Sequence, residues 1–537
     1  MKKIFYLFFI LPWFLFGINN TVLSSELVNT NSQSKNFKPF DCNKLKTEFL
    51  RVNKSNDCLI VQELSNKYEV KSSEVDPNTW NRSLLLRYID NSDGEKIIAH
   101  TWNNVVKWGD SSNKQPFSNL AVIDIPNLNQ IFEKNLNEIS SMHYTLPLTA
   151  RRLDTIDTDN DGDKEIIYLS NREDGRNRNS SWKDVNYIFD LNDSSLIKFG
   201  SSHFSHDLMY ADFNGDGYFE IIDYFYDRGG NQIEVCDLKT NKCTKVRNSV
   251  KNIEIGFNHI IPSKNGAIMF GGCPNLADTT FCWSNVNYKN NRLTFNKLDN
   301  YELKPKPKDE ADFLIWTGDV NKKPGYWVEG SDRKEFKQAD RSWMSTSIDY
   351  NKDGFIDSIG IEKEVSCKRK DVSKPFNRSF GDCSDEAYLY IFKNIEDKKF
   401  EKHQIIPTTI NDTFRIEKAD VNKDGTVDLY GFRQSYYNPW SVCDRQQLKS
   451  IYLNKKNQYF EHASSKFIEE NFGLYGCERM SNFFEKDGQY YRLFITTPNA
   501  ESEVAYLGIE NYTGKLTSSE KEIINTNQLD DLDALLN

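Results

Sequence analysis

Residues 418–432 read KADVNKDGTVDLYGF, and this stretch carries the pattern that decides the fold. Counting from Asp420 as position one, oxygen-bearing side chains stand at positions one, three, five and nine, and Gly425 stands at position six. Hard oxygen ligands at alternate residues wrap a calcium ion, while glycine makes the sharp turn that such a loop requires. The stretch therefore predicts a calcium-binding loop.

Three further stretches repeat the pattern: DTDNDGDKE from Asp157, DFNGDGYFE from Asp212 and DYNKDGFID from Asp349. One copy alone is often a polar turn, because Asp, Asn and Gly are the residues that turns favour. Four complete copies favour four Ca²⁺ sites, with a main-chain carbonyl at position seven. The expected ligand residues are Asp157, Asp159, Asp161, Asp163, Glu165, Asp212, Asn214, Asp216, Tyr218, Glu220, Asp349, Asn351, Asp353, Phe355, Asp357, Asp420, Asn422, Asp424, Thr426 and Asp428.

The formal net charge of −10 supports this interpretation. Four bound Ca²⁺ ions would offset most of it, so the acidity indicates a demand for cations more than a surface for basic partners. An acidic chain of this kind is not expected to bind nucleic acid.

Three weaker relatives of the loop extend the four copies into a longer repeat: DNSDGEKII, SKNGAIMF and EKDGQYYRLFI. The loop glycines of all seven are separated by 68, 55, 49, 88, 71 and 63 residues, about 66 on average, and a fixed period of this kind defines a repeat architecture. The glycines are Gly94, Gly162, Gly217, Gly266, Gly354, Gly425 and Gly488.

An apolar, β-rich run follows each glycine, and short strands precede most of the loops, so each loop is expected at the tip of a hairpin. About four strands per unit cannot bury a face alone, and the closed solution is an all-β β-propeller. We favour seven blades over eight. The 88-residue interval contains DVNKKPGYW from Asp319, which is either an eighth hairpin or an extra hairpin inside the fourth unit.

An EF-hand is the main alternative for such loops, but it needs flanking helices and a bidentate Glu at position twelve. Position twelve is Tyr168, Asp223, Gly360 or Gly431 in the four loops, and strands are expected on both sides. These features argue against an EF-hand.

The stretches DVNKDGTVDLYGF and DFNGDGYFEIIDYF resemble the repeats of the FG-GAP and VCBS family, the calcium-loop propellers of integrin α subunits and of many secreted bacterial proteins. The resemblance covers roughly residues 80–515. It implies a ring that is usually seven-bladed, with the acidic loop joining the first two strands of a blade. Ile261 and Phe483 depart from the pattern at position one, and the Gly94 loop is one residue short.

The amino-terminal residues of the chain predict that the protein is exported. Lys2 and Lys3 precede an apolar run to Phe16, and the pattern of residues 1–24 is that of a secretory signal peptide, with an uncleaved membrane anchor as the alternative. No later segment is apolar and long enough to span a membrane, so we expect a secreted, periplasmic or cell-envelope protein. Residues 25–79 are expected to form an amino-terminal extension, residues 80–515 the propeller and residues 516–537 an acidic tail.

Ten cysteines in an exported chain predict disulfides. We favour pairing between sequence neighbours, although several connectivities are compatible with the spacing. The favoured pairs are Cys42–Cys58, Cys236–Cys243, Cys273–Cys282, Cys367–Cys383 and Cys443–Cys477.

The sequence shows no nucleophile elbow, zinc-binding helix motif or glycine-rich phosphate loop. It does show long Arg- and aromatic-rich segments after the second strand of several blades, which must emerge opposite the calcium hairpins. Exposed Arg, Tyr and Trp are typical of binding hot spots, although these rings could instead pack between blades. The expected ligand-binding residues are Arg176, Trp182, Arg433, Tyr437 and Trp440.

Two function classes follow. The first is a calcium-stabilised binding protein that grips a protein or glycan through the face opposite the calcium hairpins. The second is a carbohydrate-active enzyme, a polysaccharide lyase or hydrolase, on the same scaffold. Because no catalytic constellation is visible and the carboxylate pair of a glycosidase cannot be singled out among 78 acidic residues, the first is favoured.

Overall fold

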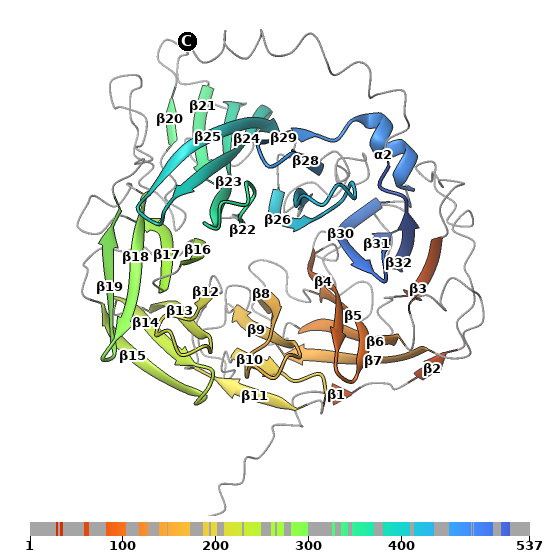
Figure 1. The fold of residues 1–537 in the computed structure, drawn as a ribbon, viewed down its shortest axis with the longest axis horizontal. Helices are drawn as coiled ribbons and strands as arrows, with labels where there is room; N and C mark the ends of the chain where they lie inside the picture. The colour runs from red at the N-terminus through yellow and green to blue at the C-terminus, as the bar shows by residue number, and fades with distance from the viewer. Residues whose placement is uncertain are drawn as a thin grey trace, which may run out of the picture.

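Seven small antiparallel sheets stand in a ring, which makes the protein a seven-bladed β-propeller (Figure 1). The computed structural model describes residues 28–29, 33–35, 58–63, 82–103, 117–125, 128, 139–147, 149–171, 186–192, 195–200, 209–227, 230–248, 259–263, 266–272, 281–298, 325–327, 335–341, 346–369, 380–408, 413–433, 451–473, 475, 477–497 and 506–515. The all-β prediction and the preferred blade number are both confirmed. The expected signal peptide and acidic tail lie outside the described residues.

The first three blades follow the chain order from the innermost strand outwards. Blade one is β4 (Arg82–Asn91), β5 (Gly94–Asn103), β6 (Phe117–Ile125) and β7 (Ile139–Pro147), with the short β1 (Val28–Asn29) and β2 (Gln33–Lys35) paired to β7. Blade two is β8 (Thr149–Ile156), β9 (Glu165–Asn171), β10 (Asn186–Phe189) and β11 (Leu196–Phe199). Blade three is β12 (Met209–Ala211), β13 (Glu220–Asp227), β14 (Gly230–Asp237) and β15 (Lys242–Asn248).

Blades four to six repeat this order. Blade four is β16 (His259–Ser263), β17 (Gly266–Gly272), β18 (Phe281–Lys289) and β19 (Arg292–Lys297), and β19 pairs in parallel with β15 of blade three. Blade five is β22 (Thr346–Ile348), β23 (Asp357–Arg369), β24 (Phe380–Ile395) and β25 (Lys399–Thr408). Blade six is β26 (Thr413–Ala419), β27 (Asp428–Arg433), β28 (Ile451–Lys455) and β29 (Tyr459–His462).

Blade seven joins the two ends of the ring. Its strands are β30 (Cys477–Lys486), β31 (Gln489–Thr497), β32 (Tyr506–Tyr512) and β3 (Cys58–Glu63), which pairs antiparallel with β32. These six residues of the 25–79 segment therefore form the outer strand of the last blade. The short helix α2 (Ser465–Asn471) precedes the blade, and the Ser464 hydroxyl caps it by accepting from the Phe467 N–H.

In the described part of the 88-residue interval, the strands form an extra hairpin and not an eighth blade. β20 (Gly325–Trp327) pairs with β21 (Glu335–Arg341), and β21 pairs with β23 beyond the point where the short β22 ends. The hairpin thus extends the sheet of blade five, so neither of the two expected alternatives, an eighth hairpin or an extra hairpin inside the fourth unit, is correct. The reason is the length of β23, whose 13 residues leave its second half open to pairing.

The core lies between blades, which explains why the strands read as continuous apolar runs. In β9, Ile166 and Tyr168 pack towards blade one, while Ile167 packs towards blade three. A strand that is buried on both faces can bury every side chain, so the polar alternation of a half-exposed strand is lost. Similar clusters fill the other blade boundaries, and the largest joins blades six, seven and one.

The Cys236–Cys243 disulfide is confirmed, and it joins facing residues of β14 and β15. Cys282 is also disulfide-bonded. The main chains of Cys367 and Cys383 face each other across β23 and β24, as their expected pairing requires. Cys42, Cys273 and Cys443 lie outside the described residues, so the pairings that include them stay predictions.

Candidate functional site: four acidic hairpins

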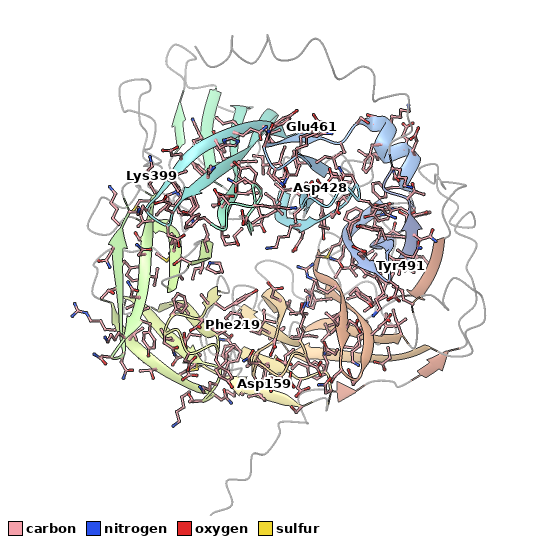
Figure 2. The ribbon with its side chains drawn as sticks, viewed as in Figure 1. Asp159, Phe219, Lys399, Asp428, Glu461 and Tyr491 are labelled. Atoms are coloured by element: carbon pink, nitrogen blue, oxygen red, sulfur yellow. A yellow bond between two sulfur atoms is a disulfide. The ribbon has the colours of Figure 1, made fainter. Side chains whose placement is uncertain are left out.

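Each complete acidic loop joins the first and second strands of a blade. The loops are 157–165 in blade two, 212–220 in blade three, 349–357 in blade five and 420–428 in blade six, and all four lie at the same end of their blades because the blades share one topology. Figure 2 shows Asp159 and Asp428, which belong to loops in different parts of the ring. The weaker relatives occupy the same β-turn position in blades one, four and seven.

The four loops share one backbone conformation. Positions four and six have positive φ in every copy. The glycine at position six meets this requirement without steric cost, because it has no Cβ. The position-four residues are Asn160, Gly215, Lys352 and Lys423, with φ of 64°, 78°, 58° and 60°.

The position-one aspartate holds each loop together. In the 420–428 loop, the Asp424 N–H donates to Asp420 Oδ1 at 3.1 Å and the Gly425 N–H donates to Asp420 Oδ2 at 2.9 Å. The position-one carboxylates Asp157, Asp212 and Asp349 likewise accept the position-six N–H at 2.9–3.0 Å. The carboxylate thereby offsets the unpaired main-chain donors of the turn.

Positions three and five follow the same plan and leave oxygen atoms at the exposed tip. In every loop the position-three side chain accepts the position-five N–H, and the position-five carboxylate accepts the position-seven N–H. Lysines stand near two of the position-five carboxylates: Lys239 Nζ lies 3.5 Å from Asp216, and Lys393 Nζ lies 3.4 Å from Asp353.

The position-nine carboxylate is buried under each loop. It accepts the N–H of the position-two residue in all four copies, at 2.6, 2.8, 3.3 and 2.8 Å. The position-two side chains are themselves buried, which fixes the loop to the core. The position-nine residues are Glu165, Glu220, Asp357 and Asp428.

Burial raises the pKa of all four position-nine carboxyls to about 7, because removal from water disfavours the charged form. The neighbouring loop carboxylates raise these pKa values further, and the main-chain donors oppose the rise. Each loop thus holds several carboxylates close to one buried acid. A nearby cation would reduce the electrostatic repulsion between these groups.

The chemistry of the donor set fits a hard cation. The side chains at positions one, three, five and nine all offer carboxylate or amide oxygens as metal ligands, and Ca²⁺ prefers oxygen ligands of this kind. In the 157–165 loop, carboxylate oxygens of Asp157, Asp159 and Glu165 lie within 4.8 Å of one another. The buried Tyr512 hydroxyl has no hydrogen-bond partner in the described part of the chain; burial raises its pKa, and Asp420 and Asp428 raise it further.

The carboxylate of Asp163 is engaged elsewhere. It accepts from the Ser92 N–H at 2.6 Å, from the Ser92 hydroxyl at 2.5 Å and from Asn192 Nδ2 at 2.7 Å. These hydrogen bonds lower the pKa of Asp163, mainly through the Ser92 hydroxyl. At position seven only the main-chain carbonyl of Asp163 is available to a cation, as the calcium-loop pattern expects.

A second repeat, not expected from the sequence, lies where the third strand of a blade ends and the following turn begins. Asn394 and Asn454 donate their N–H groups to the position-nine residues Asp357 and Asp428, each at 2.7 Å. Asp190 and Asp237 begin the equivalent turns in blades two and three, where position nine is Glu. The signal is visible in the sequence as an Asp or Asn that follows the third apolar run of each of these blades.

In the weaker hairpins of blades one and seven, lysines approach carboxylates. Lys96 Nζ, almost fully buried, lies 2.6 Å from Asp93 and 3.5 Å from Asp124. Lys486 Nζ lies 2.6 Å from Asp90 and 3.2 Å from Glu95. These ammonium groups supply positive charge where the calcium-loop pattern is incomplete.

The structure describes one of the five expected ligand-binding residues. Arg433 ends β27, whose other end begins at Asp428, so its main chain lies at the rim opposite the acidic hairpins. Arg176, Trp182, Tyr437 and Trp440 lie outside the described residues. Across the described ranges, no helix is long and apolar enough to cross a membrane.

No protein-family model and no curated protein matches the chain. Among solved structures, the chain is similar to a Trypanosoma rangeli sialidase in complex with sialic acid, with 9% identity, a TM-score of 0.28 and coverage of 86% of this chain and 58% of the sialidase. It is also similar to TolB from Acinetobacter baumannii, with 9% identity, a TM-score of 0.24 and coverage of 80% and 79%. At these identities the similarity concerns the propeller architecture alone.

Proposed function

We propose that the protein is a calcium-stabilised β-propeller, secreted or associated with the cell envelope, that binds a protein or glycan through the face opposite its acidic hairpins. The observation that supports calcium binding is the fourfold recurrence of one loop geometry, with oxygen donors at positions one, three, five and nine and a buried position-nine acid. The same recurrence supports kinship with the FG-GAP and VCBS repeats.

In this proposal each loop holds one Ca²⁺ through the side chains at positions one, three, five and nine and the carbonyl at position seven. The ion neutralises the loop and fixes the hairpin against the core. Extracellular calcium modules bind with dissociation constants on the order of 10⁻⁴ to 10⁻³ M. At tenfold excess over such a constant, each site adds about 1.4 kcal/mol to the free energy of unfolding.

Ion counting tests the calcium sites. Protein stripped with a chelator should bind four Ca²⁺ in isothermal titration calorimetry, and its melting temperature should rise with Ca²⁺. Asp424→Ala removes the position-five ligand of one loop and should leave three ions. The matched control is Asp487→Ala at the tip of the blade-seven hairpin, which should still leave four. An unchanged count in Asp424→Ala would contradict the assignment.

The ligand-binding face needs a separate test, because calcium should affect it only indirectly. Trp182→Ala, Arg433→Ala and Trp440→Ala should keep the calcium-dependent melt and weaken binding to a glycan array or to envelope proteins, by about 2 kcal/mol or more at a true hot spot. Retained binding in all three would place the site elsewhere. Turnover on a panel of polysaccharides would instead support the alternative of a carbohydrate-active enzyme.

A further inference from the structure

Two of the acidic loops are physically connected across a blade boundary. The 349–357 loop of blade five and the 420–428 loop of blade six are joined through Tyr350, in the first loop, and Asn454, which lies in β28 of blade six. The Tyr350 carbonyl accepts from Asn454 Nδ2 at 3.0 Å, and the Tyr350 N–H donates to Asp357 Oδ2 at 3.3 Å. The Asn454 N–H donates to Asp428 Oδ1 at 2.7 Å. The main chain of Tyr350, through its N–H on one side and its carbonyl on the other, and Asn454 therefore join the buried position-nine carboxylates of both loops.

Two more polar contacts strengthen the connection. Lys352, at position four of the first loop, donates from Nζ to the Gly425 carbonyl at position six of the second loop, at 3.0 Å. The Thr426 hydroxyl at position seven of the second loop lies 3.1 Å from the Asn454 carbonyl and also within hydrogen-bond distance of the Asp424 carboxylate, and its one proton is donated to one of these two acceptors. Asn454 is fully buried, so the part of the path through Asn454 and Tyr350 runs through packed groups, whereas the Lys352–Gly425 bond is exposed.

The equivalent asparagine of blade five makes no such connection. Asn394 also donates its N–H to a position-nine carboxylate, but its side chain donates to the Ile356 carbonyl and to Asp397, both in its own blade. Among the residues that the structure places, no hydrogen bond joins the 157–165 loop to the 212–220 loop. The connection is therefore specific to one of the adjacent loop pairs.

We propose that the 349–357 and 420–428 loops bind their cations as a coupled pair, with Asn454 as the positioning residue that connects them. This inference rests on the proposed calcium binding. An ion at Asp428 fixes Asn454, which holds the Tyr350 carbonyl and so restrains the main chain of the residue whose N–H donates to Asp357. The first ion orders Asn454 and the Tyr350 main chain and bears the loss of conformational entropy. The second ion meets groups that are already ordered, so it binds more tightly than the first.

Charge does not oppose this coupling strongly. Each of the two loops contains three aspartates and one lysine, so one Ca²⁺ brings its loop close to neutrality. The first ion therefore leaves little net positive charge to repel the second. By linkage, the gain in affinity must be equal in both directions.

The experiment isolates the two loops in the full chain. The double variant Asp161→Ala/Asp216→Ala disables the other two loops and leaves two ions to be counted by equilibrium dialysis against Ca²⁺. We expect a Hill coefficient above 1 and a coupling of about fivefold or more in affinity. Adding Asn454→Ala should keep two ions and bring the Hill coefficient to 1 or below. Adding Asn394→Ala, the matched control, should keep the cooperativity.

A second measurement remains informative if Asn454→Ala does not fold. Asp424→Ala in the same double variant leaves only the 349–357 loop, whose affinity should fall about fivefold below that of the second binding step in the parent. Independent binding of two ions in the parent, or equal effects of Asn454→Ala and Asn394→Ala, would overturn the coupling and leave calcium binding intact. Failure of the unmodified chain to bind any ion would overturn the proposed function itself.

Discussion

At the scale of single residues, backbone conformation at the loop tips has a measurable energetic cost. Gly354 has φ of 86°, and a Cβ added there would meet no atom within 4 Å, so a substitution would act through backbone strain alone. We expect Gly354→Ala to lower the free energy of unfolding by about 1–2 kcal/mol. Gly360, also in blade five with open space around it but without positive φ, is the control. A urea titration in which both variants lose equal stability would contradict this prediction.

His100 predicts a pH dependence that is separate from the calcium loops. The side chain is fully buried, and neither ring nitrogen has a hydrogen-bond partner among the described residues. Burial lowers the pKa of His100 to about 3. Because the folded state disfavours the protonated ring, this group costs stability as the pH falls from about 6.5 towards 3, at about 1.4 kcal/mol per pH unit.

The His100 prediction is tested by comparing the wild type with His100→Leu in chelator. Between pH 6.5 and 4.5 the free energy of unfolding of the wild type should fall more steeply than that of the variant, since carboxyl groups titrate in both. Parallel curves would show that His100 is paired or solvated.

At the scale of elements, the Cys236–Cys243 disulfide links β14 and β15, the two outer strands of blade three. Closure of so short a loop stabilises the folded state by about 2 kcal/mol in the chain-entropy description. We expect the double variant Cys236→Ala/Cys243→Ala to melt at a lower temperature by a corresponding amount and to keep its four Ca²⁺ ions. Binding of only three Ca²⁺ ions by the double variant would show that the disulfide also stabilises the 212–220 loop.

Much of this element-level structure could be predicted from the sequence, and the reason is periodicity. Glycines such as Gly162 and Gly488 mark the same hairpin in every blade because positive φ restricts the residue type there. The coupling residue Asn454 could not be predicted, because its partner Tyr350 lies 104 residues away. The extra hairpin of blade five was misplaced because pairing between β21 and β23 depends on strand length and not on local pattern.

At the scale of the whole molecule, β3 completes blade seven by pairing with β32. Truncation through Glu63 would leave the edge of β32 unpaired, and exposed edges of this kind promote association between chains. We expect the truncated protein to lose its cooperative melt or to aggregate during size-exclusion chromatography. Removal of residues 516–537 is the control and should change neither property. An intact melt in the protein that lacks β3 would show that the ring is stable without this strand.

The closing strand also sets the order of events during synthesis. Cys58 leaves the ribosome early, but its pairing partner Glu510 follows about 450 residues later. At about 5–20 residues per second, the first-made strand waits roughly half a minute or more for its position in the sheet. Contacts this distant in sequence are slow to form. Blades two to six each take their inner four strands from one stretch of chain and need no contribution from β3, so we expect closure of the ring to be the last step and the one at which another chain could pair with β32 instead.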